Sequence, residues 1–347
     1  MNTVKAFLTK KNVIFSAHRY GIDAMAAMAQ GLFASLLIGT IISTLGKQLG
    51  MQFLIDAGGY AGAVAGPAMA VSIGYALQAP QLVLFSLIAV GAAANTLGGA
   101  GGPLAVYIIA IIACEIGKMV SKETKIDILV TPAVTILSGA GLAQLLAPGI
   151  GSIASSFGTL IMWATELQPF FMGMLVSVLV GVALTLPISS AAICAALGLT
   201  GLAGGAAVAG CCAQMVGFAV LSYKENGFGG LISQGLGTSM LQMPNIIKNP
   251  KVWIAPTLAS AITGPLATYV FHFANNGPAV SSGMGTCGLV GPIGVYTGWA
   301  EEGRLITGMD WLAMALICII LPAVLTWFFG RIERRLGWIK VDDLKLQ

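Results

Sequence analysis

Apolar residues follow one another along this chain in runs of membrane-crossing length, separated by short polar or glycine-rich breaks. A helix needs about 20 apolar residues to cross a bilayer, and the first run of that length covers residues 24–45. Strong later runs cover residues 103–120, 128–146, 188–210 and 305–329. Weaker runs, interrupted by glycine or proline, lie between them. The pattern predicts an all-α polytopic membrane protein with about 10–12 transmembrane or re-entrant segments.

The composition agrees with this pattern, because 57% of the 347 residues are hydrophobic and only 9% are charged. Soluble domains contain about 25% charged residues, and a chain with so few charges could not cover its own surface in water. The 46 glycines are expected where membrane helices approach one another closely. No polar stretch is long enough to fold alone, so we expect residues 1–347 to form a single multi-pass membrane domain.

Most basic residues flank the apolar part of the chain, in a lead-in at residues 1–20 and a tail at residues 331–347. The positive-inside rule therefore predicts that both termini are cytoplasmic, which requires an even number of crossings. No basic stripe with interleaved aromatic residues occurs, so nucleic acid is not an expected partner. The flanking basic residues are Lys5, Lys10, Lys11, Arg19, Arg331, Arg334, Arg335, Lys340 and Lys345.

Three sequence landmarks occur twice in the same order, which predicts an internal duplication with repeat 1 at residues 24–148 and repeat 2 at residues 166–274. The first copy begins with an outward crossing and the second with an inward one, so the two copies should be inverted. Inverted repeats are the usual architecture of secondary transporters, whose solute lies near the midplane at discontinuous helices. A hairpin at residues 275–299 and a final span at 305–329 follow. The landmarks pair Gly31, Ser35 and Gly39 with Gly173, Ser177 and Gly181, the motif at Asn95 with that at Asn226, and Pro132 and Gly139 with Pro256 and Gly264.

The second landmark, an Asn-x-x-Gly-Gly motif, combines an amide with glycines that end helices and free backbone polar groups. At membrane depth such groups are tolerated only where they face protein or a water-filled cavity. The motif is therefore a candidate for solute binding, and two helix C-caps at the membrane interface are the alternative interpretation. Its residues are Asn95, Gly98 and Gly99 in repeat 1 and Asn226, Gly229 and Gly230 in repeat 2.

The predicted hairpin carries too many amides and hydroxyls for a lipid-facing helix, so we expect it to line a solute cavity. His272, just before it, is either a structural hydrogen-bonding group or part of the solute path. A polar imidazole near the end of a membrane helix costs free energy, so it is expected to have one of these roles. The candidate hairpin residues are Asn275, Asn276, Ser281, Ser282 and Thr286.

Carboxylates near the spans are the remaining candidates. Glu166 precedes repeat 2 and Asp23 precedes repeat 1. Each is either a solute or proton site or an interfacial charge at a helix start. Glu115 and Lys118 are spaced for an ion pair on one helix face.

Catalytic motifs such as GxxxxGK and HExxH are absent. The six cysteines are interpreted as small apolar helix residues. We therefore expect that the protein is not an enzyme and that it binds no metal or cofactor.

Residues 282–293, Ser-Gly-Met-Gly-Thr-Cys-Gly-Leu-Val-Gly-Pro-Ile, are preceded by His-Phe-Ala-Asn-Asn-Gly-Pro at 272–278. Together they resemble the integral-membrane IIC-like family (EIIC type 2) of the phosphotransferase system, which includes the perfringolysin O regulator proteins. The segment at residues 125–139, with its Thr131-Pro132 pair, is similar too. The resemblance spans nearly the whole chain.

This resemblance implies a permease component of the bacterial cytoplasmic membrane, surrounded by lipid and working as a homodimer by alternating access. The solute would be a small polar molecule such as a carbohydrate, phosphorylated by separate IIB and IIA proteins. The chain departs from many sugar-specific members, because Thr286-Cys-Gly288 occupies a comparable hairpin where they carry Gly-Ile-Thr-Glu. Two alternatives therefore stay open: a gradient-driven secondary transporter without phosphorylation, and a membrane regulator or sensor that retains a transporter fold.

Overall fold

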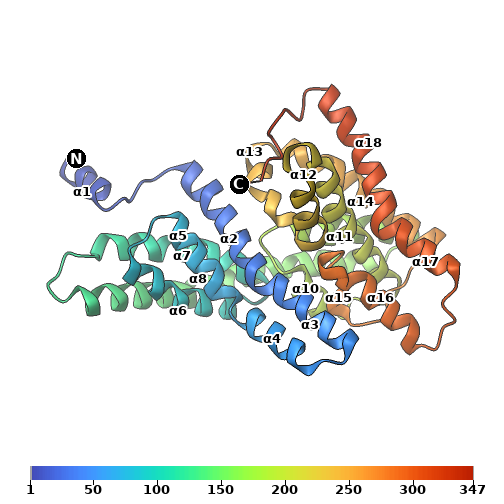
Figure 1. Ribbon diagram of the computed structural model, residues 1–347, viewed down its shortest axis with the longest axis horizontal. Coiled ribbons are helices and arrows are strands. Elements are labelled where there is room, and N and C mark those ends of the chain that lie inside the picture. Colours follow the sequence, from blue (N-terminus) through green and yellow to red (C-terminus); the bar gives the residue numbers. More distant parts are fainter. Residues whose placement is uncertain (1, 347) are drawn as a thin grey trace. The chain divides into compact units, whose positions relative to one another are not determined.

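The computed structural model describes residues 2–346, and every regular element in this range is a helix (Figure 1). The predicted all-α membrane class is therefore confirmed. The inverted relation of the two repeats and the side on which the termini lie stay predictions. Within residues 2–346, five helical stretches are long and apolar enough to cross a membrane: Arg19–Leu49, Gln81–Val120, Asp127–Thr165, Gly201–Leu221 and Gly308–Arg335.

The chain folds into two compact units, Met1–Ile153 (unit 1) and Ala154–Gln347 (unit 2). The boundary between them falls inside the long helix α8 (Asp127–Thr165), which contains Pro132 and Pro148. This boundary lies between the two predicted repeats.

Unit 1 is a set of helices that pack in sequence-adjacent pairs, α3 on α4, α5 on α6 and α6 on α7, while α2 packs on α5. Glycines permit the close approach of α5 and α6, because a Cβ on Gly66 would lie 2.4 Å from the carbonyl oxygen of Gly91. This is the packing expected of small residues in membrane helices. The helices are α1 (Asn2–Lys10), α2 (Ala24–Leu32), α3 (Ile38–Leu49), α4 (Gln52–Ala63), α5 (Ala65–Ala76), α6 (Gln81–Gly98) and α7 (Gly102–Val120), with the first part of α8.

A buried polar cluster ties the N-terminal segment to unit 1. The predicted pair of Glu115 and Lys118 is confirmed, with the Lys118 Nζ 2.9 Å from a Glu115 carboxylate oxygen. The pair is buried, since only 1% of the Lys118 side chain is accessible. Lys118 also donates to the carbonyl oxygens of Asn12 (2.6 Å) and Leu77 (3.1 Å). These bonds satisfy an ammonium group that would otherwise be costly to bury.

Lys11 forms a second attachment at the loop between α7 and α8. Its ammonium group donates to the carbonyl oxygen of Ser121 and pairs with Glu123. The hydrogen bond from Lys11 lowers the pKa of the exposed Glu123 carboxyl below its ordinary value. A carboxylate that ionises more readily favours this attachment at neutral pH, and the attachment should weaken as acid protonates Glu123.

Unit 2 is built around α11, which is almost fully buried and packs against α9, α14 and α18. The apolar run at residues 188–210 does not form one helix, because α10 and α11 are separated by a break at residues 197–200. The longer helices of unit 2 are α9 (Pro169–Thr185), α11 (Gly201–Leu221), α12 (Tyr223–Ile232), α14 (Ile254–Pro265), α16 (Val290–Glu301) and α18 (Leu321–Arg335). The shorter ones are α10 (Ser190–Ala196), α13 (Met243–Lys248), α15 (Ala279–Ser282) and α17 (Gly308–Ala315).

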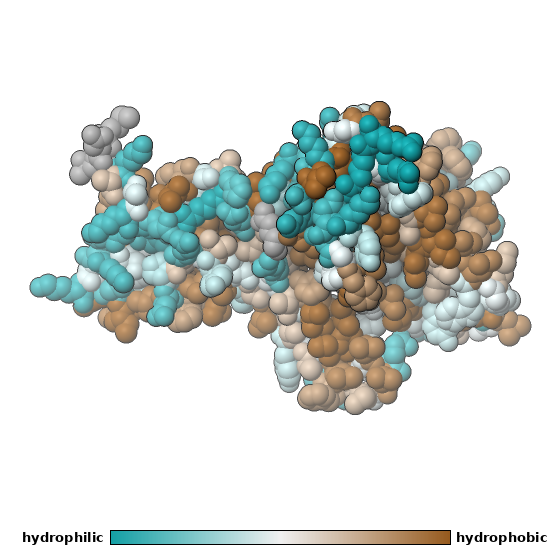
Figure 2. Space-filling view, turned by 45° about the horizontal axis from the view of Figure 1, so that its top comes forward, coloured by the Kyte–Doolittle hydropathy of each residue, from teal (hydrophilic) through white to brown (hydrophobic). Residues whose placement is uncertain are grey.

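Large hydrophobic side chains remain exposed on the outer faces of the helices, including Trp311, Val324, Trp327 and Phe328. Figure 2 shows hydrophobic residues along the sides of unit 2 and hydrophilic residues gathered toward the end that carries the C-terminal segment. A lipid-facing surface accounts for this exposure, because soluble proteins rarely leave so large an apolar surface in contact with water.

Candidate functional site

Two stretches of non-helical backbone meet inside unit 2, and we call them the broken segments: residues 186–200, which contain the short helix α10, and residues 271–289, which contain α15. The helices α10 and α15 pack against each other. Gly201, the first residue of α11, and Asn275 exchange two backbone hydrogen bonds, of 2.8 and 2.9 Å. This isolated bridge joins the second broken segment to the start of α11, directly after the first broken segment.

Asn275 is the centre of the polar network in the second broken segment. Its Nδ2 donates to the hydroxyl oxygens of Ser281 (3.0 Å) and Ser282 (2.7 Å), while its Oδ1 accepts from the Gly277 amide at 3.3 Å. Asn275, Ser281 and Ser282 are all buried. The structure thus brings three of the residues proposed from the sequence into direct contact.

Residues of the first broken segment complete this network, and they were not among the candidates from the sequence. Ser282 donates to the carbonyl oxygen of Leu199 at 2.7 Å, and Ser190 donates to that of Gly283 at 2.7 Å. Ser189 caps α10 by accepting from the Ala192 amide at 3.2 Å. The signals that could have found them are the Pro187-x-Ser-Ser and Gly198-x-Thr-Gly patterns, which resemble the end and start of helices.

Glycines let the second broken segment lie directly against its neighbours. A Cβ on Gly205 of α11 would lie 1.6 Å from the carbonyl oxygen of Phe273, and one on Gly294 of α16 would lie 2.0 Å from the Ser281 hydroxyl oxygen. Thr286 is also buried here, and its hydroxyl lies 3.7 Å from the Met215 sulfur. The position of the segment therefore depends on backbone contacts that no larger residue would permit.

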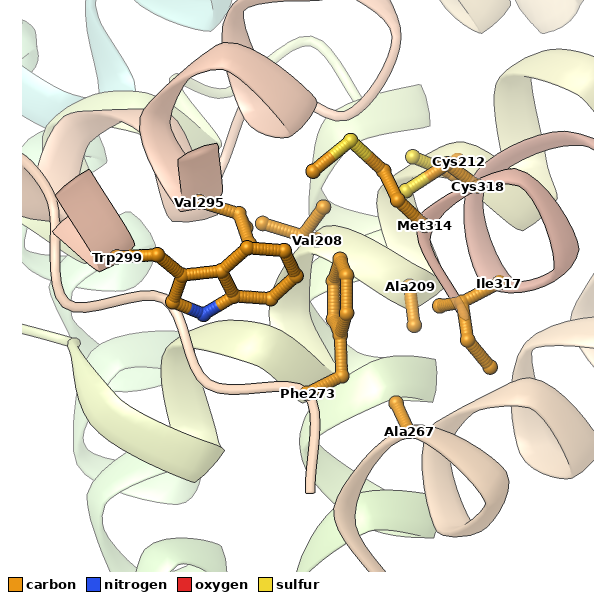
Figure 3. Close-up of a cluster of buried hydrophobic side chains, with 10 residues drawn as sticks. All are labelled: Val208, Ala209, Cys212, Ala267, Phe273, Val295, Trp299, Met314, Ile317 and Cys318. Atoms are coloured by element: carbon orange, nitrogen blue, oxygen red, sulfur yellow. The ribbon is translucent and has the colours of Figure 1, made fainter. Parts of the chain in front are cut away.

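An aromatic pair fixes both ends of the stretch that runs from the second broken segment through α16 (Figure 3). The rings of Phe273 and Trp299 meet edge to face, with centroids 5.6 Å apart and an interplanar angle of 90°, a favoured arrangement for aromatic pairs. Trp299 Nε1 also donates to the carbonyl oxygen of Ala274 at 3.0 Å. Further members of the buried cluster are Val208, Ala209, Cys212, Ala267, Val295, Met314, Ile317 and Cys318.

A second buried amide, Gln214 of α11, lies in the same unit and was not a candidate from the sequence. Its Oε1 accepts from Trp253 Nε1 at 2.9 Å and from the Thr185 hydroxyl at 3.3 Å. Its Nε2 donates to the Thr257 hydroxyl at 3.3 Å. A fully buried amide in an apolar span is expensive unless it is paired or functional. Its sequence signal is a single glutamine inside the apolar stretch of α11.

Asn226 holds the chain's own C-terminal segment. Its Nδ2 donates to the carbonyl oxygen of Leu344, and its Oδ1 accepts from the Leu346 amide, both at 2.8 Å. Gln242 and Asn245 add bonds to the carbonyl oxygens of Leu344 and Lys345, both at 3.0 Å. This amide cluster binds the tail as it would bind an extended peptide.

We expect Asn226→Ala to loosen this tail, because both hydrogen bonds of the amide are lost at once while those of Gln242 and Asn245 remain. Hydrogen exchange in the C-terminal peptide should become about five- to thirtyfold faster, since each of the two lost hydrogen bonds contributes about 0.5–1 kcal/mol. Asn276→Ala, which removes an exposed amide away from the tail, is the matched control and should leave the exchange rate unchanged. Equal exchange in the parent protein and Asn226→Ala would contradict this role.

The remaining candidates lie outside the network around Asn275. In unit 1, Asn95 is half-buried near the end of α6, and Gly98 and Gly99 lead into the turn that joins α6 to α7. In unit 2, Glu166 is exposed just after α8, and Gly229 and Gly230 lie on α12 beside the tail-binding amides. His272 is exposed with a φ of 47°, and Asn276 is exposed and donates to Glu302 at 2.7 Å.

Comparison with known proteins gave one result. The sequence model of the family described as "Phosphotransferase system, EIIC" matches residues 22–346, nearly the whole chain. The match covers the broken segments and most of both units. No curated protein and no solved structure gave a match.

Proposed function

The chain belongs to the EIIC family of the phosphotransferase system, and from this premise we propose that it moves a small polar solute, a carbohydrate, across the membrane by alternating access. The family match confirms the resemblance drawn from residues 272–293. A phosphotransferase-type permease is the membrane transport component of its system. The solute and the transport mechanism are the parts that we propose.

The observation that carries the proposal is the pair of broken segments joined at Gly201 and Asn275. Transporters hold their solutes at discontinuous helices near the midplane. Non-helical backbone at membrane depth is tolerated only where it is buried in protein or lines an aqueous cavity. Two such segments packed together in one membrane unit therefore support a solute site at their junction.

The chemistry of the network suits an uncharged polyol. An amide and two hydroxyls, those of Asn275, Ser281 and Ser282, supply donors and acceptors without a net charge. In the closed arrangement of the broken segments these groups bond to one another. We propose that a sugar's hydroxyls take the place of these internal partners when the site opens, because such an exchange keeps every buried polar group paired.

Phosphorylation of the solute would be supplied by separate IIB and IIA proteins, as the family implies. All six cysteines of the chain are buried, and buried thiols are chemically inert. The chain's own contribution in this proposal is to bind the solute and expose it to the donor. The proposed homodimer would place two such sites in one assembly.

Transport assays in proteoliposomes test this function. With purified IIA and IIB carriers and a phosphoryl donor, we expect one class of sugar to appear inside as its phosphate ester, and none without the donor. Accumulation driven by a proton or sodium gradient without the donor would instead indicate a secondary transporter. Ligand-induced thermal stabilisation without uptake of any sugar would indicate a regulator or sensor.

Glu166 and His272 are proposed as proton-handling partners of the solute path, and Glu166→Gln tests the first. If the carboxylate handles a proton, the variant should lose the pH dependence of uptake while solute binding persists. The Glu301→Gln variant, which changes another exposed carboxylate of unit 2, is the control and should retain the parent pH profile. An unchanged profile in Glu166→Gln removes Glu166 from the path.

A further inference from the structure

A cationic cavity of about 530 Å³ lies between the end of α18 and the start of α12, entirely within unit 2. We call it the α18 cavity. Its walls combine basic side chains with apolar and aromatic ones, among them Leu221, Tyr223, Leu231 and Trp327. It is separate from the network around Asn275, and the proposed transport function does not use it.

Four cations line the α18 cavity: Lys224, Arg331, Arg334 and Arg335. Arg334 is neutralised by Glu225, with 2.8 Å between its Nη2 and a carboxylate oxygen. Within residues 2–346 the structure records no ion pair for the other three. The cavity therefore presents a strong positive potential that favours an anionic ligand.

The cavity also lies where the apolar surface of a membrane span ends. Along the outer face of α18, Val324, Trp327 and Phe328 are exposed, and Arg331 and Arg335 follow within two turns. The Arg331 guanidinium lies 5.5 Å from the centroid of the Trp327 ring. Aromatic residues next to basic ones are typical of the boundary between hydrocarbon and headgroups.

We propose that the α18 cavity binds the headgroup of an anionic phospholipid. The phosphate is held by Arg331 and Arg335, because paired guanidinium groups bind phosphate through charge-assisted hydrogen bonds. Lys224 contributes from the opposite wall, and the acyl chains run along the exposed face at Trp327 and Phe328. A free phosphate would use the same cations but would gain nothing from this apolar face.

Binding to the detergent-purified full chain tests the site, with short-chain phosphatidylglycerol, short-chain phosphatidylcholine and inorganic phosphate as probes. Phosphatidylglycerol should raise the melting temperature and form adducts in native mass spectrometry, while the other two probes should not. The double variant Arg331→Gln with Arg335→Gln should bind phosphatidylglycerol at least tenfold more weakly. The control, Lys122→Gln with Lys125→Gln, removes the same charge from an exposed loop of unit 1 and should bind like the parent.

Each contrary outcome has a defined meaning. Equal binding of both lipids would overturn recognition of the headgroup charge, and stabilisation by inorganic phosphate alone would overturn the lipid assignment. Equal losses of affinity in the double variant and the control would mean that the net charge of the protein, and not the α18 cavity, determines binding. If the double variant does not fold, Lys224→Gln is the deciding variant. Lys224 is exposed and lies on α12, so its replacement should lower the affinity for phosphatidylglycerol about threefold without disturbing α18.

Discussion

Gly205→Ala is expected to destabilise unit 2 strongly, although it adds only one methyl group. The new Cβ would lie 1.6 Å from the carbonyl oxygen of Phe273, and the closest atoms belong to the backbone. A flexible side chain could rotate away, but a carbonyl group can move only if α11 or the second broken segment shifts as a whole. Overpacking of this kind costs about 3 kcal/mol, so we expect a melting temperature lowered by roughly 10 °C, or failure to fold.

Gly141→Ala is the matched control for this prediction. Gly141 is also a glycine inside a helix, α8, but nothing lies within 4 Å of its Cβ position. Because alanine has the higher helix propensity, this variant should be neutral or more stable by up to about 1 kcal/mol. Thermal unfolding of both purified proteins in the same detergent makes the comparison. Similar melting temperatures for the two variants would mean that the second broken segment does not rest directly on the backbone of α11.

The close approach of helices at glycines could be predicted from the sequence, whereas the partners of those glycines could not. Gly31 of the first landmark packs on the backbone of Ala68, while its counterpart Gly173 packs on that of Gly264. Composition and spacing show that a face is small enough for contact. Which helix packs against that face depends on the arrangement of the whole unit. The hydropathy of the sequence does not report this arrangement.

The network around Asn275 was only half predictable for a related reason. The amide and hydroxyl density of residues 275–286 marked that segment, but Leu199 and Gly201 on the other side lie in a mostly apolar run whose few polar residues also suit ordinary helix ends. Gly198 and Gly201 adopt φ values of 59° and 64°, which break the helix there and which hydropathy does not report. In the same way, the partner of Asn226 lies more than 100 residues away in the sequence, so no local pattern could indicate the tail.

Asn275→Ala is the second change with a large expected effect, because one truncation removes three hydrogen bonds of a buried network. Hydrogen bonds between membrane segments contribute about 0.6 kcal/mol each on average, and the orphaned Gly277 amide adds a further cost. We therefore expect a loss of about 2 kcal/mol, seen as a melting temperature lowered by roughly 4–8 °C. Uptake of the solute should fall with it.

Asn276→Ala provides the comparison, since the neighbouring amide is exposed and donates to Glu302 at the surface. Its effect should stay below about 0.5 kcal/mol, as for other surface changes. Asn275→Asp separates the two roles of the buried amide, because the carboxylate retains the acceptor for Gly277 and loses both donors to the serines. If that variant keeps the parent melting temperature and transports normally, the Nδ2 donors are dispensable. The solute site as proposed, in which the Asn275 amide donates to the sugar's hydroxyls, would then be wrong.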